Sequence, residues 1–140
     1  MHIVIEEHGD LLVVAVEGRL ESGLEAAELS RYFSQAFQAN RGLIVDLSQC
    51  EELGPPACSI LVYYASKYKT AQLFLCLIIT PEQEGLQQVL ASQLFNNFSI
   101  FENVDLADAA YAKSPEKQRA DNALLRYMAE RATDAELRGE

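Results

Sequence analysis

Short apolar runs alternate with longer segments of helical periodicity along this chain, and this alternation constrains its fold more than any other feature. Residues 11–16, 43–47 and 73–79 are apolar runs of strand length. The segments between them are long enough for helices and repeat apolar side chains every three or four positions. Single strands separated by such helices pair in parallel through right-handed crossovers. The sequence therefore predicts an α/β fold.

The N-terminal residues predict a hairpin. His2–Glu6 alternate between apolar and polar residues, which is typical of an edge strand. A Gly9-Asp10 turn joins this strand to the apolar run that follows, so we expect the two strands to pair with each other. Gly18 is expected to end the second strand, and Ser22 to cap the first helix.

Four helices are predicted in the body of the chain. The first follows Ser22, and the second opens at Gly54-Pro55-Pro56, because the missing N–H of proline has no intrahelical acceptor in the first turn. The third is expected to start at Thr80-Pro81-Glu82 and to bury Leu86, Val89, Leu90 and Leu94. A short fourth helix, with Asp105 as its cap, is expected after a last strand at residues 99–101.

A long helix is predicted at the C-terminus. It opens at Ser114-Pro115, runs to about Leu137 and has a thin apolar face formed by Ala120, Leu124, Tyr127 and Met128. We therefore expect residues 1–112 to form one domain, and residues 113–140 to form a helical C-terminal extension that contributes little to its core.

The chain is strongly acidic, with a formal net charge of −10 at pH 7. The excess lies in residues 1–112, because residues 113–140 carry equal numbers of acidic and basic residues. A surface this acidic repels phosphate backbones and anionic lipids, so we expect no nucleic-acid partner. The apolar run at residues 73–79 is far too short to cross a bilayer, so we expect no direct membrane insertion.

No combination of residues in the sequence indicates catalysis or metal binding. His2 and His8, the two histidines, have no ligand-like spacing to other donors, and a solvated role explains them best. Asp46 ends an apolar run, and a strand-end carboxylate is its simpler interpretation. Motifs for nucleophilic, phosphate-binding or dinucleotide-binding sites are absent from the sequence. We therefore expect no catalytic residue, no metal site and no cofactor, in a chain that is not an enzyme.

The three cysteines indicate a reducing compartment. Cys50, Cys58 and Cys76 are odd in number and have no CxxC spacing, and the neighbours of the last two are apolar or small. This pattern predicts reduced, partly buried thiols rather than a disulfide framework. Met1 is not followed by a segment that looks like a signal peptide, so the expected location is cytoplasmic.

Four segments occur in an order and at a spacing that resemble a known family. They are Val16–Glu21, Ile44–Ser48, Leu75–Pro81 and Leu86–Phe98. They are similar to motifs of STAS domains, the anti-sigma factor antagonist family. The resemblance implies a STAS-like (SpoIIAA-like) fold, with a four- to five-stranded mixed sheet and helices mostly on one side. It also implies cytoplasmic partner switching, in which such domains bind anti-sigma factor kinases or serve as subunits of stress-sensing or lipid-transport assemblies.

The sequence departs from that family where its switched members are phosphorylated. Those members carry Asp-Ser-Ser-Gly or a close relative at the start of the second long helix, and a partner kinase phosphorylates a Ser or Thr there. The corresponding residues here are Gly54, Pro55, Pro56 and Ala57, which offer no acid and no hydroxyl. Ser59, one turn further on, is a candidate displaced phospho-acceptor, although an ordinary surface serine is the simpler interpretation.

The resulting prediction is a non-enzymatic, protein-binding regulatory module that is not switched by phosphorylation at the usual site. Its partner is expected to be an anti-sigma factor kinase or another signalling or complex subunit, bound by a loop formed by Gly54, Pro55, Pro56, Ala57 and Cys58. Two alternatives stay open. One is a STAS subunit of a lipid-transport or signalling complex, and the other is a small-ligand sensor that uses the same loop at the carboxyl ends of the strands.

Overall fold

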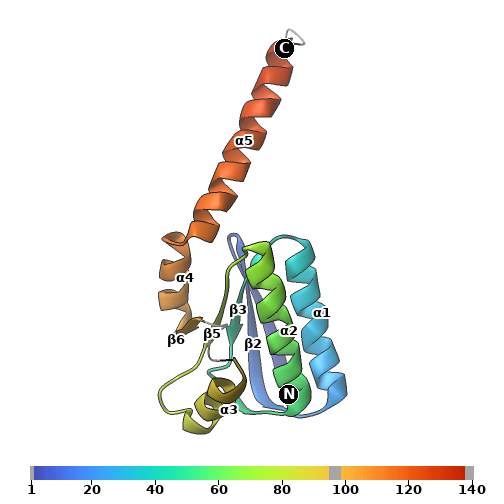
Figure 1. The fold of residues 1–140 in the computed structure, drawn as a ribbon, viewed down its shortest axis with the longest axis vertical. Coiled ribbons are helices and arrows are strands. Elements are labelled where there is room, and N and C mark those ends of the chain that lie inside the picture. Colours follow the sequence, from blue (N-terminus) through green and yellow to red (C-terminus); the bar gives the residue numbers. More distant parts are fainter. Residues whose placement is uncertain (1, 95–98, 138–140) are drawn as a thin grey trace.

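The computed structural model describes residues 2–94 and 99–137, which form a mixed sheet flanked by helices (Figure 1). The described strands are β1 (His2–His8), β2 (Leu11–Leu20), β3 (Gly42–Asp46), β4 (Cys50–Leu53), β5 (Leu75–Ile78) and β6 (Ser99–Phe101). The described helices are α1 (Gly23–Gln38), α2 (Pro55–Ala71), α3 (Glu84–Leu94), α4 (Val104–Ala112) and α5 (Pro115–Leu137). This architecture confirms the predicted α/β fold.

The strands follow the order β1-β2-β3-β5-β6, and β4 pairs separately with β2. β1 is antiparallel to β2, as the hairpin prediction requires, and the remaining pairs are parallel. The described sheet therefore has six strands rather than the four or five expected, because β4 adds a strand that the sequence pattern did not indicate.

The prediction that Gly18 ends the second strand is wrong. Gly18 has a φ of 85°, a backbone conformation that glycine adopts without steric cost. The chain bulges between Gly18 and Arg19, and β2 then continues to Leu20 in parallel pairing with β4. The glycine thus redirects the strand instead of ending it.

Apolar side chains lie on both faces of the sheet. The larger cluster packs β-strand side chains against α1, α2 and α3, with Phe33 and Tyr64 in edge-to-face contact at a centroid distance of 5.5 Å. The smaller cluster packs the opposite face against Ala107 and Tyr111 of α4. Helices therefore cover mostly one side, as expected, and α4 covers the other (Figure 1).

Two helix starts differ from the sequence prediction. α3 begins at Glu84 rather than at Thr80, because residues 81 and 82 form a turn, and Val89 is exposed rather than buried. The cap of α4 is Asn103 instead of Asp105, and its side chain accepts a hydrogen bond from the Leu106 N–H. The STAS-like segment Leu86–Phe98 is described only as far as Leu94, whose side chain also lies outside the described residues.

α5 extends away from the remainder of the molecule, which we call the body (residues 2–112) (Figure 1). Its first turn contacts the body through Lys117, whose Nζ lies 2.9 Å from Asp10 Oδ2 in the β1–β2 turn. Arg119 donates a hydrogen bond to the Gln72 carbonyl at the end of α2. From Ala120 to Ala132 every residue is exposed.

Candidate functional site

The start of α2 lies where β2 and β4 end side by side. Gly54 is the N-cap of α2, and its N–H donates to the Leu20 carbonyl at 2.8 Å. A Cβ at this position would lie 3.0 Å from the Glu21 carbonyl oxygen, closer than side-chain carbons normally pack. Glycine is therefore needed here for the close approach of two backbones, and the position of α2 is fixed against the end of β2.

The five residues of the predicted partner loop differ in their exposure. Pro55 is exposed and Pro56 is half-buried, whereas Ala57 and Cys58 are 1% and 2% exposed. The inward-facing side of α2 thus begins with its third residue. A partner at this loop would contact Pro55 and Pro56 rather than the side chains of Ala57 and Cys58.

Three exposed side chains continue from the loop along α2, and we call them the outer face of α2. They are Pro55, Ser59 and Tyr63, spaced four residues apart and therefore aligned on one side of the helix. Tyr63 is 52% exposed, and the Lys67 ammonium lies 5.2 Å from its ring centroid. The outer face thus presents a hydroxyl and an aromatic ring in line with Pro55.

An exposed leucine lies three residues after Glu21, whose backbone approaches Gly54. Leu24, in the first turn of α1, is 86% exposed. A capping box fixes this turn, because Ser22 Oγ accepts from the Glu25 N–H while the Glu25 carboxylate accepts from the Ser22 N–H. Leu24 was not among the predicted site residues, although it falls outside the helical register of the buried residues Ala26, Leu29, Phe33 and Ala36.

Charged residues flank the loop on the side of β4. Arg19 lies within 4 Å of three carboxylates, those of Glu21, Glu51 and Glu52, at 3.8, 3.4 and 3.9 Å. All four side chains are more than half exposed, so each pair is weak in water. The group as a whole is acidic. Glu51 and Glu52 belong to β4.

The turn before β4 is held by a glutamine that the sequence analysis missed. Gln83 Nε2 donates to the carbonyls of Leu47 and Cys50 at 2.8 and 2.9 Å, and its Oε1 accepts from the Thr80 N–H. One side chain thus connects the ends of β3 and β5 to the start of β4. Gln83 is a positioning residue for the strand that leads into Gly54.

The cysteines are free and buried, and their surroundings suppress thiolate formation. Burial raises the pKa of Cys50 to about 11 and that of Cys76 to about 12, and it also raises the pKa of Cys58. A buried thiol with a raised pKa is a poor nucleophile at neutral pH.

The other candidate residues lie apart from α2. His8 pairs with Glu6 on β1, and His2 is exposed at the start of the same strand. Asp46 ends β3 and accepts from the Ser48 N–H, in agreement with a strand-end role. Within the described ranges, no three His, Cys, Asp or Glu side chains are placed to hold a metal ion. No helix of these ranges has the length and apolarity that a bilayer span requires.

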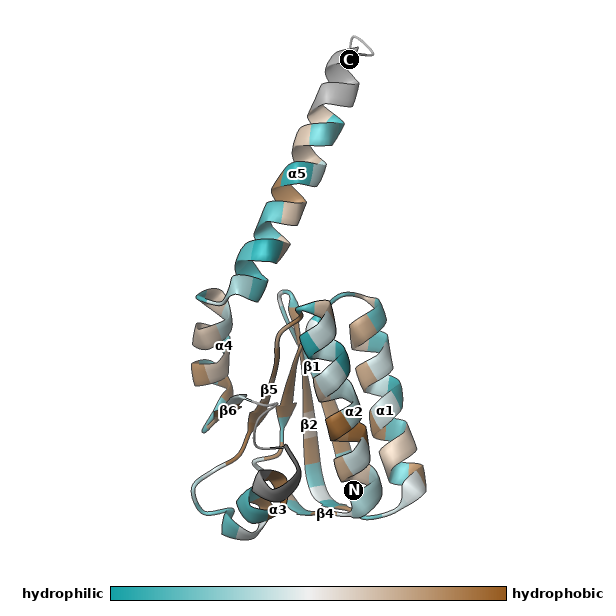
Figure 2. Ribbon diagram, in the orientation of Figure 1, coloured by the Kyte–Doolittle hydropathy of each residue, from teal (hydrophilic) through white to brown (hydrophobic). Residues whose placement is uncertain are grey.

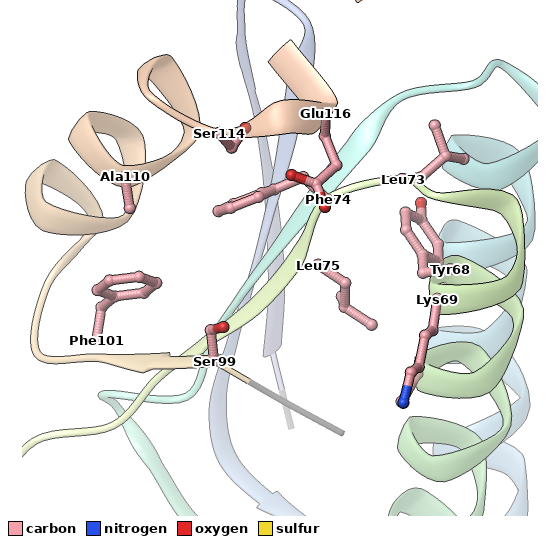
Figure 3. Close-up of a pocket in the computed structure, with 11 residues that line it drawn as sticks. Tyr68, Lys69, Leu73, Phe74, Leu75, Ser99, Phe101, Ala110, Ser114 and Glu116 are labelled. Atoms are coloured by element: carbon pink, nitrogen blue, oxygen red, sulfur yellow. The ribbon is translucent and has the colours of Figure 1, made fainter. Parts of the chain in front are cut away.

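A hollow of about 430 Å³ lies at the opposite end of the sheet, near the start of β5 (Figure 3). Figure 3 shows Tyr68 and Lys69 of α2 on one side, Phe101 and Ala110 on the other, and Glu116 of α5 above. The ligand-sensor alternative places a ligand beside Gly54 instead, and this hollow is separated from Gly54 by the length of α2.

Comparisons with known proteins bear on the fold. No protein-family model and no curated protein matches the sequence. Among solved structures, an anti-sigma factor antagonist from Mycobacterium paratuberculosis is 22% identical, with a TM-score of 0.66 over 78% of this chain and 92% of that one. A putative anti-sigma factor antagonist from Thermotoga maritima is 13% identical, with a TM-score of 0.63 over 76% and 92% of the two chains.

A third solved structure is the phosphorylated form of the Bacillus cell fate determinant SpoIIAA. It is 12% identical, with a TM-score of 0.59 over 78% of this chain and 99% of that one. Identities this low are informative about architecture rather than about activity. The chain therefore has the SpoIIAA-like fold of STAS domains, the fold of these anti-sigma factor antagonists.

Proposed function

We propose that this chain is a protein-binding regulatory module that acts as anti-sigma factor antagonists do, without phosphorylation at the usual position. The observation that carries the proposal is the start of α2. The SpoIIAA-like fold is kept there, yet residues 54–57 contain no hydroxyl that could accept a phosphoryl group. The partner is an anti-sigma factor kinase or a related signalling subunit, and the interaction takes place in the cytoplasm.

The exposed residues around this helix start support a protein partner. Leu24, Pro55 and Tyr63 present apolar surface to solvent. Glu21, which belongs to the acidic group around Arg19, approaches Gly54 beside Pro55. Apolar surface with a charged rim is typical of protein-protein contacts, in which charge complementarity sets orientation and association rate. We infer that residues 1–112 form the binding domain and that its partner presents a basic rim.

The sharpest test adds hydroxyls at residues 55 and 56, where switched members of the family carry serines. In the double variant Pro55→Ser with Pro56→Ser, an active kinase partner should phosphorylate α2 at its start, and ATP should release the complex. A phosphoryl group adds about −1.5 to −2 charge at the contact. The parent chain should remain bound and unmodified in ATP. Binding is measured by titration calorimetry against the partner retained from the source organism, and modification by mass spectrometry.

The matched control is Pro55→Ala with Pro56→Ala, which removes the same rings and adds no hydroxyl. It should stay unmodified in ATP and should not be released by ATP, because it offers no hydroxyl. Any loss of affinity that it shares with the serine variant measures the contribution of the two rings. Phosphate on Ser59 of the parent would contradict the proposal. So would a double serine variant that binds a demonstrably active kinase and stays unmodified.

A second test locates the contact surface. Ser59→Asp places a charge on the outer face of α2 and should weaken binding at least tenfold, or about 1.4 kcal/mol. Ser66→Asp makes the same change at an exposed position about 10 Å further along the helix and should bind as the parent does. Equal affinities for all three chains would move the contact away from α2. Ala57→Asp is unsuitable, because Ala57 is buried and the change would unfold α2.

A further inference from the structure

The apolar residues of α5 form a stripe on a helix that otherwise faces water. Leu124, Leu125, Tyr127 and Met128 are 57%, 63%, 55% and 57% exposed. At 3.6 residues per turn they span about 160° of the helix circumference. Figure 2 shows hydrophobic ribbon near the middle of a largely hydrophilic α5. We call these four residues the arm stripe.

The base of α5 is fixed, so the arm stripe is held away from the body. Lys117 bridges Asp10 of the β1–β2 turn and Asp121 of its own helix, at 2.9 and 3.0 Å. Tyr111 donates a hydrogen bond to the same Asp10 carboxylate, and Arg119 donates to the Gln72 carbonyl. These contacts from three elements set the direction of α5, and residues 120–132 project into solvent.

A projecting helix of this kind depends on a partner for its stability. Helices in water gain most of their stability from packing an apolar face, and isolated ones are marginal even at favourable composition. α5 has 23 residues and is about 35 Å long. The contacts of Lys117 and Arg119 stabilise the first turns of α5, but residues 120–132, which follow them, are exposed.

The geometry points to a second copy of this chain as the occupant of the arm stripe, with the two α5 helices packed antiparallel. The stripe covers residues 124–128, and the midpoint of Pro115–Leu137 is residue 126. A twofold axis through the centre of the helix therefore places each stripe directly on its copy. The two bodies then lie at opposite ends of the pair, where they do not collide.

The charges along α5 favour the antiparallel arrangement. Residues 115–126 contain three basic and two acidic residues, whereas residues 127–137 contain one basic and three acidic residues. Antiparallel packing sets the basic half of each helix beside the acidic half of the other and opposes the helix dipoles. Parallel packing would instead bring two acidic bodies, which carry the whole net charge of the chain, to the same end.

The size of α5 limits the affinity of the proposed antiparallel dimer. A helix about 35 Å long and 10 Å wide presents one side only, which places a pair at the small end of specific interfaces. Dimer formation should therefore depend on protein concentration, with a dissociation constant in the micromolar range. This inference is independent of the proposed function.

Sedimentation equilibrium of the full chain from about 1 to 300 μM tests the association. The parent should change from monomer to dimer across this range, and Leu124→Glu should shift the transition at least tenfold upward. Asn122→Glu adds the same charge on the opposite side of the helix and should leave the transition unchanged. A chain that stays monomeric throughout, or equal transitions for the two variants, would overturn the proposal and assign the stripe to a different protein.

Disulfide cross-linking tests the orientation. The native thiols are buried, so an introduced surface cysteine is the reactive group. An equimolar mixture of Ala120→Cys and Ala132→Cys should oxidise to a mixed dimer, because antiparallel packing brings these positions together. Each variant alone should cross-link at least tenfold more slowly. Faster cross-linking of the separate variants would show parallel helices and overturn the antiparallel arrangement.

Discussion

The body buries most of its large apolar side chains in two clusters on the faces of the sheet, whereas residues 120–132 of α5 leave theirs in water. The body carries the whole net charge of −10, and residues 113–140 carry none. The two regions are joined by a few polar contacts at Asp10 and Gln72. The body is therefore stabilised by its own core, whereas α5 is stabilised by the contacts at its first turns and by whatever covers the arm stripe.

The largest contrast is expected between matched truncations in the two regions. Phe33→Ala removes a ring that is 1% exposed and should cost about 3–5 kcal/mol of unfolding free energy, with Phe33→Leu as a milder variant. Leu124→Ala should change stability by less than about 0.5 kcal/mol, because alanine is at least as good a helix former. Urea unfolding at low micromolar concentration measures both. A loss of more than 1 kcal/mol of unfolding free energy in Leu124→Ala would show that α5 packs as part of the core.

Alkaline pH should weaken the body through its buried thiols. Burial raises the pKa of Cys50 to about 11 and that of Cys76 to about 12, from an ordinary value of 9.0. Above pH 9 the unfolded chain therefore holds fewer protons than the folded chain, and stability falls as pH rises toward 11. Each thiol contributes a slope of up to about 1.4 kcal/mol per pH unit. Urea midpoints between pH 8 and 11 should show this fall, with a shallower slope in Cys76→Ala, and a flat profile would contradict it.

A smaller loss is expected at the turn that leads into β4. Gln83→Leu removes the donor to the carbonyls of Leu47 and Cys50 and should cost about 1–3 kcal/mol. Gln88→Leu, at an exposed position of α3, is the matched control and should be neutral. Urea unfolding measures the two side by side. Equal stabilities would mean that water replaces the Gln83 amide without cost.

The smallest effect is expected from removing residues 114–140. The deletion breaks the ion pair of Lys117 with Asp10, and exposed pairs of this kind contribute about 0–1 kcal/mol. The shortened chain should keep a cooperative thermal transition and its near-ultraviolet circular dichroism. Loss of either signal would show that the body needs residues 114–140 to fold, which would contradict a domain boundary at residue 112.

Local sequence rules predicted the parts of the fold that local forces decide. The β1–β2 hairpin follows from alternation and the Gly9-Asp10 turn, and the Ser22 cap follows from its spacing to Glu25. β4 was missed because two successive glutamates break the alternation, and because its pairing depends on a bulge at Gly18. Pairing with a distant strand leaves no local signal of this kind.

The predicted partner loop remains a prediction, and the sequence analysis did not foresee how unevenly its residues are exposed. Ala57 and Cys58 lie four and three residues before the apolar Leu61, so the helical period alone could have placed them on the buried side of α2. The helical period of α1 could likewise have predicted that Leu24 is exposed. The role of Gln83 could not be predicted from the sequence, because its two acceptors lie more than thirty residues away.

β2 is paired on its first half with β1 and β3 at once, and on its last residues with β4. Alternate amides of a central strand donate to its two neighbours, so those of Leu11–Ala15 that donate to β3 stay bonded when the edge strand β1 opens. Their hydrogen exchange should therefore report the global unfolding free energy, whereas α5 should exchange through fraying at a small fraction of it. A deuterium-uptake map would then rank the chain from its slowest strand to its fastest helix, with Asp10 and Lys117 at the boundary between the two regimes.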